Sequence, residues 1–330
     1  MKGFDPQYQD FPDYILKITK EIWEDRGVST LHKYYAPNIV VRSPSGITLG
    51  NQAVIGATLA TLAEFPDREL LGEDVIWSGT PETGMLSSHR ILSTATHLGD
   101  GHYGQASQRK LKYRVIADCH AINNQIDDEW LIRDSGAIVR QLGTTPEAFA
   151  RAQVEREGGI SRCATPFRPT HDVPGPYQGQ GNESEWGQRY AQTLQQIMTA
   201  DMTTIKHSYD RACQGEYPGG MSANGWTAVE GFWLPLRAAM PDARFEIAHC
   251  IGNEGGLLPP RAAIRWSLSG KHTGPGLFGQ ASGADIYVMG ICHAEFGPWG
   301  IRREFALIDE VAIWKQIHLH NSKSSSSSTS

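Results

Sequence analysis

The sequence predicts an α+β fold that is repeated twice in tandem. Displaced by 175 residues, the chain matches itself, and four polar residues keep the same register: Arg90, His97, Glu129 and Asp134 recur as Arg265, His272, Glu304 and Asp309. In each half a helical pattern comes first and several β-rich runs follow, which is typical of the α+β class. The repeat is far longer than the unit of a solenoid, so we interpret it as two copies of one complete domain.

Each half opens with helices. Apolar residues recur at helical spacing over two equivalent stretches, 12–25 and 186–200. A second pair of helices is expected over 51–64 and 227–240. Each member of this pair stops at a proline placed identically in both halves, and proline cannot continue a helix without losing a hydrogen bond.

The pattern then changes to β-rich runs. These runs cover 69–77, 85–97, 110–122 and 126–134 in the first half, and 243–251, 261–272, 284–295 and 301–309 in the second. Runs that follow one another through short turns predict an antiparallel meander. We therefore expect helices packed on an antiparallel sheet in each half.

Composition divides the chain into four parts. The expected units are a first domain over 1–143, a linker over 144–183, a second domain over 184–320 and a tail over 321–330. The linker begins with a helix that Pro146 starts and continues as a stretch dense in Gly, Pro and Gln. The tail is nearly all serine, which predicts disorder.

Charge and composition exclude several classes of partner. The formal net charge is −6 and the basic residues are scattered, which argues against a nucleic acid or an anionic membrane. The sequence contains no long apolar run, so we expect a soluble, cytoplasmic protein. The five cysteines show no metal spacing, and neither a Gly-rich phosphate loop nor an HExxH motif is present. We therefore expect no cofactor and no metal.

A set of spaced motifs carries a family resemblance. In the first half these are Phe65-Pro66-Asp67, Arg90, Thr96-His97-x-Gly99, Gly104, Glu129-Trp130-x-x-x-Asp134 and Gln141-Leu142-Gly143. They resemble the SnoaL-like polyketide cyclase family, a branch of the nuclear transport factor 2-like superfamily. The resemblance implies a conical cup in each half, made of a curved antiparallel sheet closed by helices, with an apolar pocket on the concave face. It also implies a cofactor-independent acid/base enzyme that acts on a small hydrophobic carbonyl compound through an enolate, as a cyclase, an isomerase or a lyase.

The resemblance also implies catalytic residues. The family's acid/base aspartate falls on Asp134, and on Asp309 in the second copy. An apolar environment would raise the pKa of such a carboxyl toward neutrality. His120, 14 residues before Asp134, takes the place where the family can carry a second catalytic histidine. In the second copy His293 lies 16 residues before Asp309, which departs from that spacing. The alternative for Asp134 is a surface or turn-capping role.

Two further pairs are expected to support the site. His97 and His272 follow a strand that also carries Arg90 or Arg265. The spacing of seven residues is odd, so the two side chains share a face only if a bulge intervenes. The alternative is that each histidine caps a turn and each arginine pairs with a buried carboxylate such as that of Glu129 or Glu304.

Aromatic side chains are expected to line the cup. By strand parity Trp130 lies on the same face as Asp134, beside the reacting atoms. The full set expected to bind substrate is Tyr34, Trp77, Arg90, Trp130, Arg265, Trp266 and His293.

The main alternative is a non-catalytic protein that binds a small ligand, with one or both cups inactive. In that case the tandem copies form a fixed pseudo-dimer that replaces a homodimer. Whether a further homodimer forms is left open by the sequence.

Overall fold

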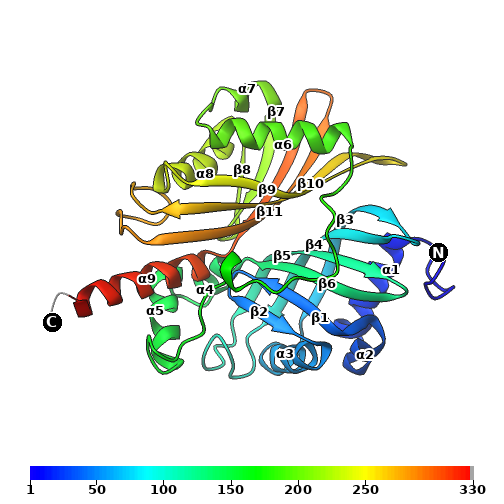
Figure 1. Ribbon diagram of the computed structural model, residues 1–330, viewed down its shortest axis with the longest axis horizontal. Helices are drawn as coiled ribbons and strands as arrows, with labels where there is room; N and C mark the ends of the chain where they lie inside the picture. Colours follow the sequence, from blue (N-terminus) through cyan, green and yellow to red (C-terminus); the bar gives the residue numbers. More distant parts are fainter. Residues whose placement is uncertain (328–330) are drawn as a thin grey trace.

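The two halves of the chain form two α+β domains whose sheets face each other (Figure 1). The structure is a computed structural model, and it describes residues 1–327. Each domain has a six-stranded sheet, and the helices that precede its meander lie on the side that faces away from the other domain. The predicted α+β class and the tandem repeat are confirmed.

The first domain begins with helices and ends with the meander. Its helical elements are α1 (Phe11–Thr19), η1 (Lys20–Glu24), η2 (Val28–Thr30), α2 (Leu31–Tyr34), α3 (Asn51–Glu64) and α4 (Ser135–Gln141). Its strands are β1 (Tyr35–Ser43), β2 (Gly46–Leu49), β3 (Glu69–Thr80), β4 (Gly84–Thr96), β5 (Lys110–Ile122) and β6 (Gln125–Arg133). The strand order is β2-β1-β6-β5-β4-β3.

The second domain repeats this plan. Its helices are α6 (Glu185–Met198), α7 (Thr204–Ser208), α8 (Trp226–Ala239) and α9 (Glu310–Ser327). Its strands are β7 (Tyr209–Tyr217), β8 (Met221–Asn224), β9 (Arg244–Gly255), β10 (Leu258–Lys271), β11 (Asp285–Gly297) and β12 (Gly300–Ile308). The order β8-β7-β12-β11-β10-β9 matches that of the first sheet. The linker contributes α5 (Pro146–Arg156) and the short η3 (Pro169–His171).

The predicted sheet was incomplete in one respect. The meander of β3 to β6 is antiparallel as expected, but β1 joins its far edge in parallel, with Val41 opposite Glu129. Strands β1 and β2 and their counterparts β7 and β8 are not among the β-rich runs predicted from the sequence. The sheets are therefore mixed, because a strand that follows the helices enters beside the last strand of the meander and runs in the same direction.

The repeat also shifts by one residue in this region. Tyr35 pairs with Ile126, and in the second domain Tyr209 pairs with Ile301. Tyr209 is thus the counterpart of Tyr35, although a constant offset of 175 aligns it with Tyr34. A hairpin that is one residue longer between β7 and β8 restores the offset before the following helix.

The outer faces of the two sheets pack against each other. Apolar side chains of both sheets meet there in two clusters, which include Ile116, Ile132, Met289, Ile291 and Leu307 in one and Ile76, Leu86, Ile251 and Ala263 in the other. Helix α9 leaves the second sheet and lies along α5 of the linker (Figure 1). The outer faces thus form the domain contact, and the concave face of each sheet lies under the helices of its own domain.

Helix α9 changes the expected tail. It continues to Ser327, so the first part of the segment expected to be disordered, from 321 on, is helical. Residues 328–330 lie outside the described chain, and the expectation of disorder stays a prediction for them.

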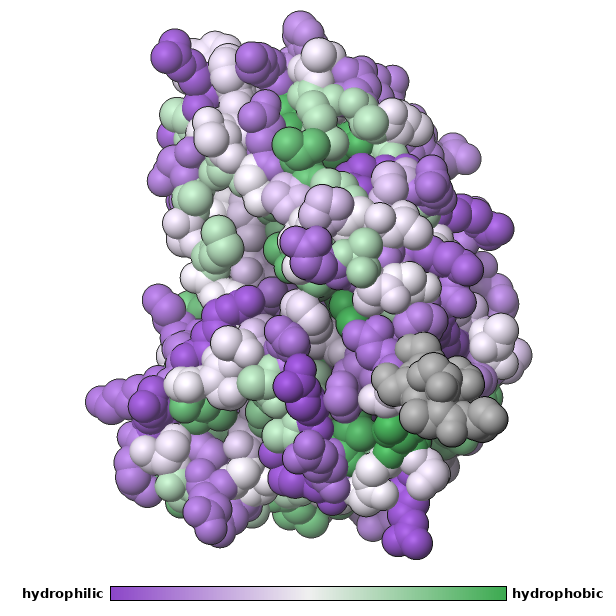
Figure 2. All heavy atoms as spheres, turned by 90° about the vertical axis from the view of Figure 1, so that its left-hand side faces the viewer, coloured by the Kyte–Doolittle hydropathy of each residue, from purple (hydrophilic) through white to green (hydrophobic). Residues whose placement is uncertain are grey.

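Seen from the end where α9 projects, the two domains form an upper and a lower lobe (Figure 2). This face is largely hydrophilic, with small separate hydrophobic patches. No helix of the described chain combines the length and the apolar character that a membrane crossing requires.

The concave side of the second sheet is filled by aromatic side chains. Trp233 of α8 and Trp266 of β10 are fully buried, with ring centres 5.8 Å apart. The indole nitrogen of Trp266 donates to the Cys292 sulfur at 2.9 Å. Gly290 on β11 makes room for this ring, because a Cβ atom there would lie 2.1 Å from the Trp266 indole.

We expect Gly290→Ala to lower the free energy of unfolding by about 1–3 kcal/mol, since the added methyl group overpacks a rigid indole. Chemical denaturation measures the change. Gly231→Ala on α8 is the matched control, because nothing lies within 4 Å of a Cβ there and alanine favours a helix over glycine. Equal stability of Gly290→Ala and wild type would contradict this packing.

Candidate functional site

The concave side of the first sheet encloses a cavity of about 180 Å³. Odd-numbered residues of β4, β5 and β6 face it, which follows from the alternation of side chains along a strand. Helices α1 and α3 cover it on the opposite side. Most of its wall is apolar, and the ionisable side chains that reach it are those of Arg68, His89, Cys119, Glu129, Arg133 and Tyr35.

Glu129 places a carboxyl group in this cavity. It lies on β6 opposite Cys119 of β5 and is 6% exposed. Burial raises its pKa from 4.5 to about 7, and a hydrogen bond with Tyr35 lowers it in part. Within residues 1–327 no group hydrogen-bonds its Oε2 atom. Glu129 is therefore a carboxyl group that can be either protonated or ionised near neutral pH and has one oxygen free.

His89 faces the same cavity from β4. Its register partner Ala117 is also the partner of Leu131, so His89 and Glu129 lie on one face with strand β5 between them. Their strands are two strand spacings apart, or ~10 Å, and Glu129 is offset from the level of His89 by two residues, or ~7 Å along the strand. Burial lowers the pKa of His89 to about 4, so its imidazole is neutral at physiological pH. No described group hydrogen-bonds its Nε2 atom.

The second domain has the matching glutamate, but its carboxylate is enclosed by side chains. Glu304 accepts hydrogen bonds from four buried donors, the hydroxyl groups of Tyr190, Tyr209 and Tyr217 and the indole of Trp233. Large aromatic residues replace small ones of the first cup: Ala57, Thr58 and Ile91 correspond to Phe232, Trp233 and Trp266. His89 itself corresponds to Ile264. The second cup is thus a packed core, whereas the first is a cavity with polar groups.

Comparison with known protein families identifies both domains. The description "SnoaL-like polyketide cyclase" matches residues 14–142 and again residues 188–317, which together make up most of the chain. The chain belongs to the SnoaL-like polyketide cyclase family.

Several solved structures are similar to one domain of this SnoaL-like protein. IdmH, a proposed polyketide cyclase from Streptomyces antibioticus, is 21% identical, and the match covers 40% of this chain and 98% of IdmH with a TM-score of 0.35. AclR, a proposed hydroxylase from Streptomyces galilaeus, is 17% identical over 41% of this chain and 98% of its own, also with a TM-score of 0.35. Comparison with curated protein sequences gives no match.

The structure places Asp134 outside the first SnoaL-like cup. It caps the N-terminus of α4, where Oδ1 accepts from the backbone N–H groups of Ala137 and Gly219 and Oδ2 from that of Gly220. The two glycines belong to the β7–β8 turn of the second domain. Burial raises the pKa of Asp134 to about 6. Its carboxylate joins the two domains through hydrogen bonds and does not line the cavity.

Asp309 has an equivalent position at the start of α9. It accepts from the backbone N–H of Ala312 at 3.1 Å and from the Ser135 hydroxyl of the first domain at 3.1 Å. Burial raises its pKa to about 6. The repetition of this aspartate reflects a helix cap that also contacts the other domain.

The structure does not bring His120 and Asp134 together. His120 lies opposite Asp128 in the sheet. The backbone N–H of Asp134 instead donates to the carbonyl of Arg114, which is six residues before His120 on β5. The His120 ring instead hydrogen-bonds Asp127 at 2.6 Å and packs on Tyr177 of the linker, with ring centres 4.7 Å apart. Since Cys119 faces the cavity, its neighbour His120 faces the other domain.

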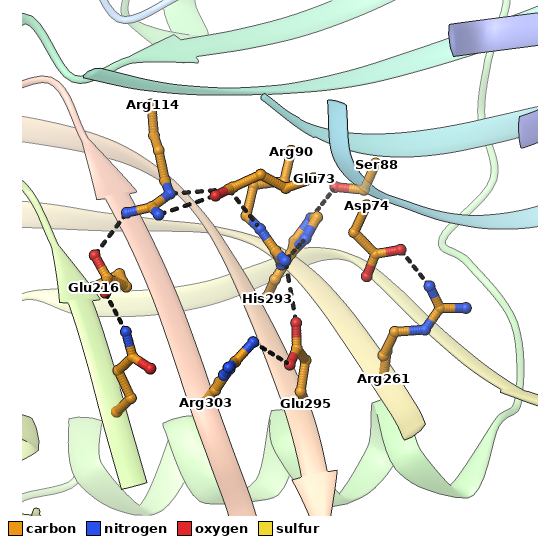
Figure 3. Close-up of polar contacts among 11 residues, drawn as sticks. Glu73, Asp74, Ser88, Arg90, Arg114, Glu216, Arg261, His293, Glu295 and Arg303 are labelled. Carbon is orange, nitrogen blue, oxygen red and sulfur yellow. Dashed lines mark hydrogen bonds and ion pairs between the residues drawn. The ribbon is translucent and has the colours of Figure 1, made fainter. Parts of the chain in front are cut away.

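Arg90 is buried between the two sheets (Figure 3). Its guanidinium contacts Glu73 of its own domain at 3.1 Å, and Glu295 and His293 of the second domain at 3.1 and 3.2 Å. It also lies over the Phe305 ring, 3.6 Å from the ring centre. Arg90 and His293, both expected to bind substrate, therefore hold the domains together. Burial and the positive charge of Arg90 lower the pKa of His293 well below its usual value, so this imidazole is neutral.

Arg265 makes the reciprocal contact. It lies over the Trp130 ring of the first domain at 3.5 Å from the ring centre, and its Nη1 is 3.5 Å from Asp118. Trp130 and Asp118 are the counterparts of Phe305 and His293 in the repeat. Trp130 and Asp134 both contact the other domain, and neither side chain lines the cavity of the first cup.

The remaining expected residues also stabilise the fold. The Nδ1 atoms of His97 and His272 lie 3.0 Å from the hydroxyls of Ser107 and Ser282, which closes the same loop in each domain. The β4–β5 pairing is continuous from Met85 to Thr96, so the bulge needed to bring His97 beside Arg90 is absent from that ladder.

The expected aromatic residues lie in the cores. The Tyr34 hydroxyl is hydrogen-bonded to Tyr8 at 2.7 Å and to Glu21 at 3.0 Å. Trp77 packs edge-on against Phe11. Trp266 fills the second cup.

The ionisable residues that reach the cavity were not predicted as site residues from the sequence. Glu129 was considered only as a partner for Arg90, and Arg68, His89 and Arg133 were not singled out. Parity would have placed Glu129 and Arg133 on the face opposite to Trp130, but parity does not say which face is concave. Within the described chain, no three His, Cys, Asp or Glu side chains gather as a metal ion would require.

We expect Arg90→Met to lower the free energy of unfolding by about 3 kcal/mol, because it removes one partner of a buried ionic network. Arg303→Met is the matched control. Arg303 also contacts Glu295, at 3.7 Å, but is 54% exposed, so its loss should cost less than about 1 kcal/mol. Equal effects of the two changes, measured by denaturant unfolding, would contradict the role of Arg90.

We expect Glu129→Gln to raise the free energy of unfolding by about 3 kcal/mol above pH 7, at ~1.4 kcal/mol per pKa unit. Between pH 4.5 and about 7 the folded protein keeps the Glu129 proton while the unfolded chain loses it, so wild-type stability falls as pH rises through this window. The difference between the two proteins should therefore shrink as pH falls from 7 and vanish below 4.5. Urea unfolding across pH tests this, with the exposed Glu155→Gln on α5 as the control. A constant difference would contradict the raised pKa.

Proposed function

We propose that the first domain is a cofactor-independent acid/base enzyme that transfers a proton at a carbon next to a carbonyl group of a small hydrophobic compound. The observation that carries this proposal is the Glu129 carboxyl, which has a pKa of about 7 and one free oxygen in an apolar cavity. A base with a pKa near the working pH has the best combination of proton affinity and ionised fraction. Membership of the SnoaL-like polyketide cyclase family supports the same chemistry.

The reaction begins when the Glu129 carboxylate removes the α-proton of the substrate. The C–H electron pair forms a C=C bond, and the π pair of the carbonyl group moves to its oxygen, which gives an enolate. The neutral imidazole of His89 can donate a hydrogen bond to that oxygen, as a preorganised donor in a dry site. The enolate carbon then attacks a second carbonyl group, whose oxygen takes the proton from Glu129. Alternatively, a conjugated enolate takes this proton at another carbon, or the enolate expels a leaving group that takes it. These outcomes correspond to a cyclase, an isomerase and a lyase.

Glu129 replaces Asp134 as the proposed base for a geometric reason. Both oxygens of Asp134 already accept hydrogen bonds from backbone N–H groups at the domain contact. A general base must reach the proton that it removes. The second domain is proposed to support the first, because the oxygens of Glu304 are occupied and aromatic rings fill its cup.

We expect the wild-type protein to exchange α-protons of ketones, β-keto esters and lactones for deuterium from heavy water, as followed by NMR. Glu129→Gln should reduce the exchange at least ~100-fold, because the amide cannot accept the proton. The wild-type rate should rise with pH and level off above about 7, as Glu129 ionises.

Asp134→Asn separates this assignment from the one that the resemblance implied. Its amide oxygen can still cap α4, so exchange should persist in this variant. Loss of exchange with Asp134→Asn but not with Glu129→Gln would contradict the proposal. Ligands that stabilise the protein without any exchange would favour the alternative, a non-catalytic binding protein.

A further inference from the structure

A cluster of polar side chains lies at one end of the first cup, beyond Leu131 from Glu129. Ser93 of β4, Tyr113 of β5 and Arg133 of β6 project from the concave face of neighbouring strands. Arg68, just before β3, donates through Nε to the Ser93 hydroxyl at 3.2 Å. Tyr103 reaches the cluster from the loop between β4 and β5 and interacts electrostatically with Arg133. We call these five residues the arginine cluster.

The cluster carries two positive charges, of which Arg68 is buried and Arg133 is half-buried. Arg68 is 5% exposed, and the Nε atom of Arg133 is buried with no hydrogen-bond partner among the described residues. Among residues 1–327, no carboxylate lies within 4.0 Å of the guanidinium group of Arg68 or Arg133. The carboxylate of Asp309 stabilises the positive charge of Arg133 only by electrostatic attraction over a longer distance. Buried charges are otherwise found paired, since leaving one uncompensated costs several kcal/mol.

The second domain shows that the fold does not need this cluster. At the equivalent positions every polar side chain is lost: Arg68, Ser93, Tyr103, Tyr113 and Arg133 correspond to Ala243, Leu268, Phe278, Val288 and Ile308. These apolar residues are all buried in the core of the second domain. The same backbone therefore folds with an apolar set, and the arginine cluster is confined to the cup that has a cavity.

Two cavities meet at the cluster. Arg68 and Arg133 line the cavity that contains Glu129, and Arg133 also lines a second cavity of about 570 Å³ together with Tyr103 and Tyr113. The side chains of Ala57, Thr61, Leu131 and Ser43 are common to both walls. Along β6, Arg133 is four residues from Glu129, or ~13 Å. A ligand with an acidic group at one end can thus contact both residues.

We propose that Arg68 and Arg133 bind a carboxylate group of the substrate, so that the substrate is a hydrophobic oxo acid whose reacting carbon lies beside Glu129. A guanidinium presents two parallel N–H donors that match the two oxygens of a carboxylate. Ser93 and the two tyrosines add hydroxyl groups around the same position. This proposal rests on the proposed function for the role of Glu129, but the anion site itself does not depend on catalysis.

Without a ligand, the phenolate of Tyr113 could balance one of the two positive charges. Its pKa is lowered, because Arg68 and Arg133 favour its phenolate although burial opposes it. One phenolate would still leave one of the two guanidinium charges uncompensated. A ligand carboxylate supplies the charge without requiring tyrosine to ionise.

Matched pairs of ligands test the charge directly. We expect 2-naphthoate, and a panel of aryl and alkyl carboxylates, to bind at least tenfold more tightly than the corresponding neutral amides in isothermal titration calorimetry at pH 8. Arg133→Ile and Arg68→Ala, which introduce the residues of the second domain, should remove this preference and keep or raise the unfolding temperature. Arg151→Gln, on the exposed side of α5, is the control and should keep the preference.

Equal binding of acids and amides across the panel, or a preference that persists in Arg133→Ile, would overturn the proposal. A preference for naphthyl phosphate over naphthoate would also overturn it, because the site would then be built for a phosphate. Glu129→Gln separates the two proposals. If it abolishes deuterium exchange but keeps the carboxylate preference, both stand. If wild type shows the preference without exchange, only the function fails, and if it exchanges without preference, only the anion site fails.

Discussion

Two buried arginines, one from each domain, hold the sheets of this protein together. Arg90 lies over Phe305 and Arg265 lies over Trp130, so each domain places a charge on an aromatic ring of the other. A buried charge tolerates little displacement from its partners, because the interior offers no water in exchange. The outer faces of the sheets are therefore committed to each other. The proposed ligand site therefore uses the concave face of the first sheet, under the helices.

The two concave faces have diverged while the frame around them stayed the same. In the second domain three aromatic rings and three tyrosine hydroxyl groups occupy the space around Glu304. In the first, small side chains at the matching positions leave a cavity, and Glu129 keeps one oxygen free. A domain with a packed core can contribute stability and a rigid outer surface, whereas a cavity and unpaired polar groups lower the stability of the domain that holds them. Such a division of roles suits a tandem protein with one working site.

The repeated polar residues show how much of the site could be predicted from the sequence. Arg90, His97 and Asp134 recur because each maintains a feature of both domains: a domain contact, a loop and a helix cap. A polar residue that recurs in both halves is therefore more often a residue that maintains the fold than a residue that lines the cavity. Glu129 also recurs, yet its environment differs between the copies. The residues that are specific to one copy, His89 and Arg133 among them, carry the difference, and a search for identities could not find them.

The sequence by itself determined the tandem α+β plan, the helices before each meander, the extents of its strands and the family. These follow from local periodicity, from breakers such as Pro66 and Pro241, and from motif spacing, all of which act over short stretches of chain. Only the tertiary structure decided which face of each sheet is a cup. Alternation along β6 separates Glu129 from Trp130, but the packing of the second sheet on one side and of helices on the other determines which of them meets a ligand.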